Sequence, residues 1–344
     1  MRALVGGSSV PSVTDTAEQF DVVGIGNALV DVLTHEDDEF INANGLAKGA
    51  MILIDTERAE SLYAAMGQGI EVSGGSAANT IAGIASFGGR AAYIGRVADD
   101  ELGAVFAHDL RATGASYTCP PAPDGPPTGR CLIIVSPDAE RTMNTYLGAS
   151  ELFGPDDLDA ELIAAARVVY LEGYLFDRPA AQEAFWTASR IAHDAGRQVS
   201  LTLSDTFCVQ RHQEAWRSLV TDEVDLLFAN EGEVMALYDV TTVGEAIERV
   251  KNEVETAAIT RGARGSLVVN KGEVIDVAAH PVGAVVDTTA AGDLYAAGFL
   301  FGFTNGRSLE DCGRLGSLGA SAVIGHTGAR PALSLAGLVA DLGL

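Results

Sequence analysis

The chain has 344 residues and a formal net charge of −25, from 47 Asp and Glu residues against 22 Lys and Arg residues. Such an acidic surface repels phosphate backbones and anionic lipids, which argues against nucleic acid or membranes as partners. Hydrophobic residues make up 47% of the chain, enough for a large core. No apolar run approaches the ~20 residues of a membrane span. Residues 1–19 lack a secretory signal, so we expect a cytoplasmic protein with a flexible leader there.

From Phe20 onward, short apolar runs alternate with Ala- and Leu-rich stretches of helical spacing, the pattern of an α/β domain. The expected strands are 20–26, 91–97, 167–172, 198–203, 224–229, 255–260 and 265–270. The expected helices are 57–67, 76–87, 101–113, 156–165, 179–195, 209–219, 231–238, 243–253, 290–304, 308–325 and 333–342. Most of these strands are apolar on both faces, which predicts a mostly parallel sheet flanked by helices on both faces.

Two stretches, 33–54 and 116–149, break this alternation. They lack convincing helices and contain β-rich runs, notably 130–136 and 141–147, which predict a small second sheet that acts as a lid. The large domain is then expected to comprise 20–32, 55–115 and 150–344. Free edges of a small sheet would also allow two copies to pair, so a homodimer through the lid is a further expectation.

The first expected strand is followed by GIGN at 24–27. No glycine completes a G-x-G-x-x-G fingerprint, which argues against a dinucleotide site and hence against a dehydrogenase. Asn27 and Asp31 stand just past the strand, at the edge where open α/β sheets bind their ligands. An amide and a carboxylate in this position suit the vicinal hydroxyls of a sugar, although the same pair would also serve as a cap or turn.

The segment GGSAAN at 74–79 is a glycine turn that leads into an Ala-rich helix, with Asn79 in its first turn. Glycines such as Gly74 and Gly75 allow a ligand to approach the backbone closely, and the N–H groups at a helix start donate hydrogen bonds. A simple packing turn is the alternative. The chain contains no Gly-Lys dipeptide, so it has no Walker A loop.

The most informative segment is DTTAAGD at 287–293, between a β-type run and a long apolar helix. The backbone N–H groups of residues 290–293 are expected to form an anion-binding nest at the helix start. Asp293 is poorly suited to binding an anion, but beside such a nest it suits a general base that takes a proton from an attacking hydroxyl. A helix-capping Asp is the alternative.

Two further segments fit the same chemistry. Asn230 and Glu233 open a helix after a strand, where their oxygens could hold a hydrated Mg²⁺. The backbone of TRGARGS (260–266), with Thr260 and Gly262, could follow nucleotide phosphates. Helix capping and a hairpin turn, respectively, are the alternatives.

Together, these motifs resemble those of the PfkB or ribokinase-like carbohydrate kinases. GGSAAN is similar to the first signature of that family and DTTAAGD to the second. The segments 230–233 and 260–265 resemble its magnesium and nucleotide segments, and GRVADDELG (95–103) resembles one of its helix starts. The match runs from about Phe20 to the C-terminus in the family order. The resemblance implies a ribokinase-like fold and a kinase that uses ATP and Mg²⁺.

Within that family, GIGNALVDV (24–32), PTGRCL (127–132) and ERTMNTYLGAS (140–150) are most similar to adenosine kinases and the bacterial sugar kinases close to them. The implied acceptor is therefore the 5′-hydroxyl of a ribonucleoside such as adenosine. The implied substrate-binding residues are Asn27, Asp31, Gly74, Gly75, Asn79 and Arg141. The implied nucleotide-binding residues are Asn230, Thr260, Gly262, Gly265 and Thr288, with Glu233 and Asn230 near Mg²⁺ through water. Asp293 is the implied base, and Ala290, Ala291 and Gly292 the implied anion hole.

Several alternatives stay open. Arg141 is expected to be a mobile cation that closes over phosphate, or else a solvated charge of the lid. Ala290 stands where the family usually has Gly, and a positive φ there would cost about 1 kcal/mol or more. Candidates for covering a nucleobase are Tyr170, Tyr174, Leu175, Phe176 and Phe207, whereas Glu172 would suit a polar sugar. The alternatives to a nucleoside kinase are a kinase of ribose, fructose or a keto-deoxy sugar acid, and a non-catalytic nucleoside sensor.

Overall fold

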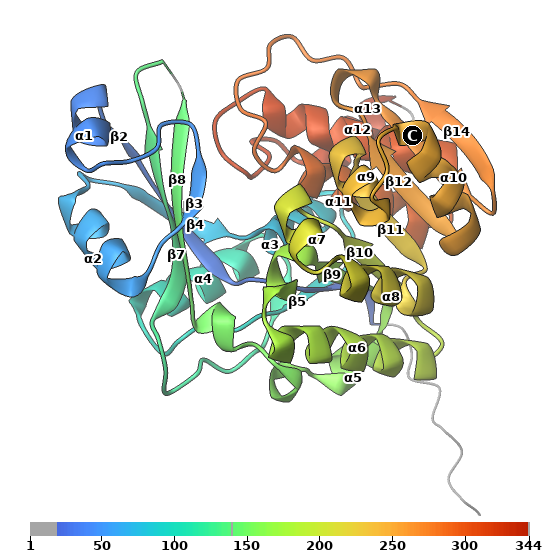
Figure 1. The fold of residues 1–344 in the computed structure, drawn as a ribbon, viewed down its shortest axis with the longest axis horizontal. Coiled ribbons are helices and arrows are strands. Elements are labelled where there is room, and N and C mark those ends of the chain that lie inside the picture. The colour runs from blue at the N-terminus through green and yellow to red at the C-terminus, as the bar shows by residue number, and fades with distance from the viewer. Residues whose placement is uncertain (1–18, 139, 343–344) are drawn as a thin grey trace, which may run out of the picture.

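The computed structural model describes residues 19–138 and 140–342. The expected flexible leader, 1–19, lies outside the described residues except for Gln19. Figure 1 shows a large sheet surrounded by helices and a small sheet that stands beside it. The expected α/β fold, with a mostly parallel sheet between helices and a second small sheet, is therefore confirmed. Among the described helices, none is both long and apolar enough to cross a membrane.

Within the described residues, the large sheet has nine strands. In spatial order they are β14 (Glu273–Val277), β13 (Ser266–Asn270), β12 (Thr256–Thr260), β11 (Leu226–Asn230), β10 (Gln198–Thr202), β9 (Ala166–Glu172), β1 (Phe20–Ile25), β5 (Ala91–Ile94) and β6 (Ser116–Tyr117). β13 pairs antiparallel with β12 and β14, and the other neighbours pair parallel. The carboxyl ends of the parallel strands therefore meet at one edge.

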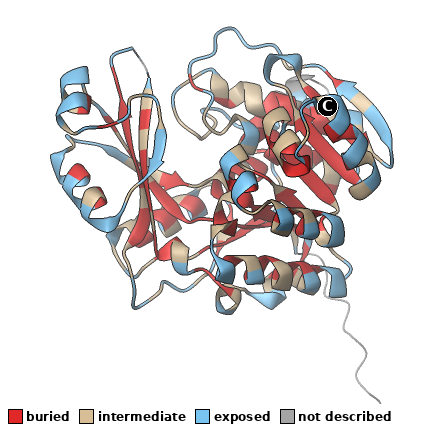
Figure 2. Cartoon of the chain, viewed as in Figure 1, coloured by how far each residue is buried: buried red, intermediate tan, exposed pale blue. Residues whose placement is uncertain are grey.

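Successive side chains of each central strand enter different cores. Val22 of β1 belongs to one apolar cluster and Val23 to another, as expected for a sheet that is covered on both faces. The first cluster includes residues of α3 (Ser76–Ser86), α4 (Glu101–Ala112), α11 (Ala291–Thr304), α12 (Leu309–Ile324) and α13 (Leu335–Leu342). The second includes residues of α5 (Ala160–Ala164), α6 (Pro179–Asp194), α7 (Thr206–Arg211), α8 (Gln213–Glu223), α9 (Glu231–Tyr238) and α10 (Val243–Glu253). Figure 2 shows these strands buried and the outer helix faces exposed.

The small sheet contains, in spatial order, β3 (Met51–Leu53), β8 (Arg141–Gly148), β7 (Thr128–Val135), β2 (Leu29–His35) and β4 (Ile70–Gly74). Its side chains also alternate. Leu132 and Ile134 of β7 pack in the same cluster as residues of α1 (Asp38–Ala43) and α2 (Thr56–Ala65). Cys131 and Ile133 form a separate patch with Met143 on the opposite face. One face of the small sheet is therefore covered by helices, and the other is free to face a ligand.

The small sheet differs from the expected segments 33–54 and 116–149. β2 already begins at Leu29, and β4 comes from a segment that was expected in the large domain. Both strands belong to the small sheet, because β2 pairs with β4 and with β7. The short helix α1 lies where no helix was expected, and the Asp37 carboxylate caps it by accepting from the Phe40 N–H.

Several other elements were expected differently. β6 and β14 were not expected. The expected helix 209–219 is instead two helices separated at His212, and 156–165 is a 3₁₀ turn followed by α5. The described 3₁₀ turns are η1 (Ala149–Leu152), η2 (Pro155–Asp157), η3 (Gly173–Asp177) and η4 (Gly262–Arg264).

Candidate active site

A cleft of about 850 Å³ lies at the carboxyl edge of the large sheet, between that edge, the small sheet and the start of α11. A volume of this size suits a ligand of nucleoside or nucleotide dimensions. The predicted site residues that line the cleft are Asn27, Asp31, Gly75, Asn79, Asn230, Glu233, Thr260, Thr288, Ala290, Ala291, Gly292 and Asp293. The folding of the chain thus brings together segments that are up to about 270 positions apart in the sequence.

Asp293 lies in the first turn of α11, and both of its carboxylate oxygens accept hydrogen bonds from α3. The Ser76 hydroxyl donates to Oδ1 over 2.6 Å, and the Asn79 amide donates to Oδ2 over 2.9 Å. Burial raises the pKa of Asp293, while these two donors and the charge of Arg330 oppose the rise. The carboxylate is held in one orientation, as a general base requires. Ser76 was not among the predicted site residues, although it lies within GGSAAN.

The turn before α11 presents backbone donors to the cleft. Ala290 has φ 60° and ψ 10°, the left-handed conformation that a glycine adopts without strain. The Ala291 N–H donates to the carbonyl of Thr288 over 3.2 Å. In the described part of the chain, the N–H groups of Ala290, Gly292 and Asp293 have no acceptor. Unpaired N–H groups at a helix start form a site for an anionic group.

The glycine turn of GGSAAN is required by its neighbours. A Cβ at Gly74 would lie 2.3 Å from an oxygen of Asp31, and one at Gly75 would lie 2.3 Å from the carbonyl oxygen of Asn27. Gly75 lines the cleft and has a φ of 96°, which side chains rarely adopt. Gly74 is not among the lining residues, so its position beside Asp31 is its contribution to the site. Burial raises the pKa of Asp31 to about 6.

Glu172, at the end of β9, connects the GIGN segment (24–27) to the GGSAAN segment (74–79). Its Oε1 accepts from the Asn27 amide over 2.8 Å, and its Oε2 accepts from the Ala77 N–H over 2.7 Å. Its exposed fraction is 1%, and burial raises its pKa to about 7 against the effect of these donors. A Cβ at Gly26 would lie 2.3 Å from Oε2, so this glycine makes room for the carboxylate. Because donors of the chain already occupy both oxygens, Glu172 positions the site rather than offering a free acceptor to a sugar.

Arg141 forms an ion pair with Asp287. The pair joins the start of β8 in the small sheet to the segment that precedes the Ala290 turn, and both side chains are nearly buried. Asp287 also accepts from the N–H groups of Thr289 and Gly328, over 2.9 and 3.1 Å. Arg141 does not line the cleft in this structure, and its nearly buried ion pair differs from the alternative of a solvated lid charge. Its contact with phosphate stays a prediction.

The predicted nucleotide and metal residues are only partly brought together. Asn230 and Glu233 cap α9 reciprocally: the Asn230 amide donates to Glu233 Oε1 over 2.6 Å, and the Glu233 N–H donates to Asn230 Oδ1 over 2.9 Å. Burial raises the pKa of Glu233 to about 7. No group of three or more His, Cys, Asp or Glu side chains in the described residues could hold a metal ion. The geometry fits a Mg²⁺ that the nucleotide coordinates and that Asn230 and Glu233 contact through water better than a metal that the chain alone coordinates.

The segment TRGARGS forms the tight connection between β12 and β13. Thr260 lines the cleft, but Gly262 and Gly265 do not. Gly262 has a φ of 58°, and Gly265 has a φ of 80° with the carbonyl oxygen of Val277 2.0 Å from where a Cβ would lie. Both glycines are thus explained by the hairpin turn, which was the alternative interpretation of this segment.

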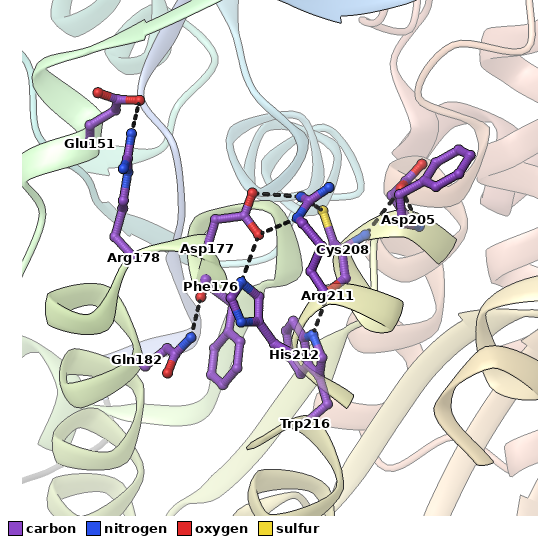
Figure 3. Close-up of polar contacts among 11 residues, drawn as sticks. Glu151, Phe176, Asp177, Arg178, Gln182, Asp205, Cys208, Arg211, His212 and Trp216 are labelled. Carbon is purple, nitrogen blue, oxygen red and sulfur yellow. Dashed lines mark hydrogen bonds and ion pairs between the residues drawn. The ribbon is translucent and has the colours of Figure 1, made fainter. Parts of the chain in front are cut away.

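Of the residues expected to cover a nucleobase, only Tyr174 and Phe207 line the cleft. Tyr170, Leu175 and Phe176 are buried in the core. Phe176 stacks on Trp216 with ring centroids 3.9 Å apart, and Figure 3 shows the two rings beside each other. Phe207 has an exposed fraction of 70% and is free to contact a ligand. The sequence could not separate these residues because all are large side chains in or shortly after strands, and only their packing decides which of them face the cleft.

Residues on two further sides of the cleft were not predicted from the sequence. The small sheet contributes apolar side chains, namely Met51, Leu53, Ile133, Met143 and Leu147. The opposite wall contributes Asp177, Cys208 and Arg211, and Figure 3 shows the Arg211 guanidinium against the Asp177 carboxylate. The alternating pattern of β7 and β8 could have indicated Ile133, Met143 and Leu147, whereas Met51 and Leu53 belong to the short strand β3.

Known proteins resemble this chain along most of its length. A model of the pfkB family carbohydrate kinases matches residues 45–335. The crystal structure of adenosine kinase from Sinorhizobium meliloti is 50% identical, covers 94% of this chain and 99% of its own, and has a TM-score of 0.87. A probable sugar kinase protein from Rhizobium etli CFN 42 is 48% identical, covers 95% and 99%, and has a TM-score of 0.88. Adenosine kinase of Saccharomyces cerevisiae is 25% identical over 84% of this chain and 90% of its own.

Proposed function

The chain belongs to the pfkB family of carbohydrate kinases and is an ATP-dependent kinase, and we propose that its acceptor is the 5′-hydroxyl of a ribonucleoside, with adenosine foremost. The observation that carries this substrate class is the composition of the cleft walls. Apolar side chains of the small sheet and the exposed ring of Phe207 both line the cleft. An aromatic base between apolar walls buries surface that a free sugar lacks.

Glu172 supports the same substrate class. A kinase of free sugars could use this buried carboxylate to bind sugar hydroxyls. Its oxygens, however, already accept hydrogen bonds from Asn27 and Ala77, so Glu172 is not free for that role. Asp31, in contrast, lines the cleft and accepts no hydrogen bond from the described residues, so it remains open to the hydroxyls of a ribose. Asn79 and Gly75 line the cleft beside it and would complete the ribose site.

The proposed reaction is an in-line phosphoryl transfer. Asp293 accepts the proton of the 5′-hydroxyl while the hydroxyl oxygen forms a bond to the γ-phosphorus and the bond to the β,γ-bridging oxygen of ATP breaks. The N–H groups of Ala290 and Gly292 would stabilise the charge on the transferred group. Bound Mg²⁺ would neutralise phosphate charge, with Glu233 and Asn230 near it through water. Thr260 and Thr288 are the cleft-lining hydroxyls that we propose contact the nucleotide.

Movement of the small sheet over the cleft would exclude water and limit wasteful ATP hydrolysis. Arg141 of the small sheet already contacts Asp287, at the start of the segment that we propose binds phosphate. We propose that it can exchange that carboxylate for phosphate when ATP is bound. The small sheet also offers the edges of β3 and β4 for pairing with a second copy, which light scattering of the purified protein would test.

A panel of acceptors tests the substrate class. Purified protein with MgATP would be given adenosine, guanosine, inosine, ribose, fructose and a keto-deoxy sugar acid, and ADP release would be coupled to NADH oxidation. We expect the highest kcat/KM with a nucleoside. Turnover with free sugars alone would instead support a sugar kinase, which the similarity to the Rhizobium etli protein makes the second candidate. Tight adenosine binding without transfer would support a sensor.

A further inference from the structure

Arg330 lies in the segment between α12 and α13, far in sequence from the first signature, yet it binds that signature directly. Its Nη2 donates to the carbonyl and the hydroxyl of Ser73, both over 2.9 Å, and its Nη1 donates to the carbonyl of Ala78 over 2.8 Å. Ser73 lies near the end of the small-sheet strand β4, whereas Ala78 lies in the first turn of α3. One guanidinium therefore clamps the two sides of the Gly74–Gly75 turn.

This clamp lies next to the residues that hold Asp293. Ala78 is close on α3 to Ser76 and Asn79, which donate to the two oxygens of Asp293. Ser73 is fixed from a third direction, because its N–H donates to Asp109 of α4 over 2.7 Å. A displacement of Ala78 would move both donors of Asp293 together. The position of the base therefore depends on Arg330 through two hydrogen bonds in series.

The charge of Arg330 is the second observation. No carboxylate in the described residues forms an ion pair with it, and its buried Nε has no hydrogen-bond partner there. It nevertheless interacts electrostatically with Asp109, Asp31 and Asp293, and it lowers the pKa of Asp31 and Asp293 against the effect of burial. A partly buried cation beside two partly buried carboxylates, unpaired with either, compensates the charge of both.

We propose that Arg330 is a positioning residue of the phosphoryl transfer: it fixes the turn and helix that orient Asp293, and its charge compensates the carboxylate of that base. This inference rests on the proposed function, because it takes Asp293 to be the base. The charged and titratable groups that face Asp293 from the elements around it are Arg330, Asp31, Tyr170, Glu172 and Tyr174. Among them, Arg330 is the only cation, so removal of its charge should raise the pKa of Asp293.

The test compares Arg330→Gln, Arg330→Lys and the control Arg314→Gln, which alters an exposed arginine of α12. The side-chain carboxyl of Asp293 would be titrated by ¹³C NMR in the full chain, with its resonance assigned from Asp293→Asn. We expect Asp293 to titrate at higher pH in Arg330→Gln and at the wild-type pH in Arg330→Lys and Arg314→Gln. Unchanged titration in Arg330→Gln would overturn the role of the charge. This readout requires no turnover, so it is independent of the acceptor.

Kinetics test the positioning role. In Arg330→Gln the acid limb of the pH profile of kcat/KM should move to higher pH, together with the titration of Asp293. At acid pH, kcat/KM should then fall ~10-fold for each pH unit by which this limb moves. Arg330→Lys keeps the charge but cannot span both carbonyls, so its kcat should fall at every pH while the limb stays in place. Wild-type kcat in Arg330→Lys would contradict the positioning role, and that variant keeps the test available where Arg330→Gln fails to fold. Absence of turnover in the wild type would refute the proposed function itself.

Discussion

The Ser76 hydroxyl donates a 2.6 Å hydrogen bond to Asp293, although 217 positions separate the two residues in the sequence. The contact joins the first signature segment to the second, and Asn79 repeats it on the other carboxylate oxygen. Hydrogen bonds to an ionised carboxylate are stronger than those between neutral groups. The arrangement therefore orients Asp293 before a substrate arrives, and this preorganisation is the basis of the first prediction.

Asp293→Asn should lower kcat by ~10²–10⁴-fold, the range that a general base contributes, because the amide cannot take the proton of the hydroxyl. The dissociation constant for adenosine should stay close to that of the wild type, since the amide has a similar shape. Steady-state kinetics and calorimetric titration would measure the two quantities. Turnover close to wild type in this variant would refute Asp293 as the base.

Ala290→Gly tests whether the left-handed residue impairs the anion hole. Glycine removes a strain of about 1 kcal/mol but adds freedom to the unfolded chain, so the free energy of unfolding should change by less than ~1 kcal/mol. Because the N–H group of residue 290 is present in both proteins, kcat should change by less than ~10-fold. A much larger gain in kcat would show that Ala290 disables transfer and would support the sensor. Ala290→Val is the matched contrast, and its branched side chain should lower both stability and kcat.

Glu172→Gln should change the pH dependence of stability. Burial raises the pKa of Glu172 from 4.5 to about 7, so between these values the folded protein binds a proton that the unfolded chain releases. The wild type should therefore lose stability relative to Glu172→Gln as pH rises from 4.5 to 7, by up to ~1.4 kcal/mol per pH unit. Urea unfolding at a series of pH values would measure the difference. A constant difference across this range would refute the raised pKa, and Glu214→Gln in an exposed position of α8 is the control.

The ion pair of Arg141 and Asp287 should contribute to stability more than an exposed pair. A double-mutant cycle with Arg141→Gln and Asp287→Asn should give a coupling in the free energy of unfolding of ~1–3 kcal/mol, because both side chains are nearly buried. The pair of Arg178 and Glu151, visible in Figure 3, is the control and should give under ~1 kcal/mol because both side chains are more exposed. Additive effects at Arg141 and Asp287 would contradict the observed contact.

The sequence was informative where the chemistry is local. GGSAAN and DTTAAGD each predicted a turn, a helix start and a functional residue at that start. The end of the first expected strand likewise indicated Asn27 and Asp31 as residues that line the ligand site. It was not informative where a residue acts through a distant partner. Arg330 and Ser73 are 257 positions apart, and no periodicity connects them. The role of Glu172 was also hidden, because its orientation depends on the space left by Gly26.

Side-chain burial explains the remaining errors at the site. Phe176 and Phe207 both follow strand ends, but Phe176 packs on Trp216 whereas Phe207 lies on the surface of the cleft. Asn230 and Glu233 have the types and spacing of a capping box as well as those of oxygen ligands, and the sequence could not decide between the two. The small sheet was predicted from β7 and β8, while β4 was missed because the residues that it pairs with, in β2, lie far away along the chain.

Identification of the product tests the central claim most directly. Purified protein would be incubated with adenosine and MgATP, and the product examined by proton-coupled ³¹P NMR. We predict a new phosphomonoester resonance split into a triplet by the two 5′-methylene protons, formed by the wild type and absent with Asp293→Asn. ATP consumption without this triplet, or a phosphomonoester that appears only when a free sugar replaces adenosine, would contradict a nucleoside kinase.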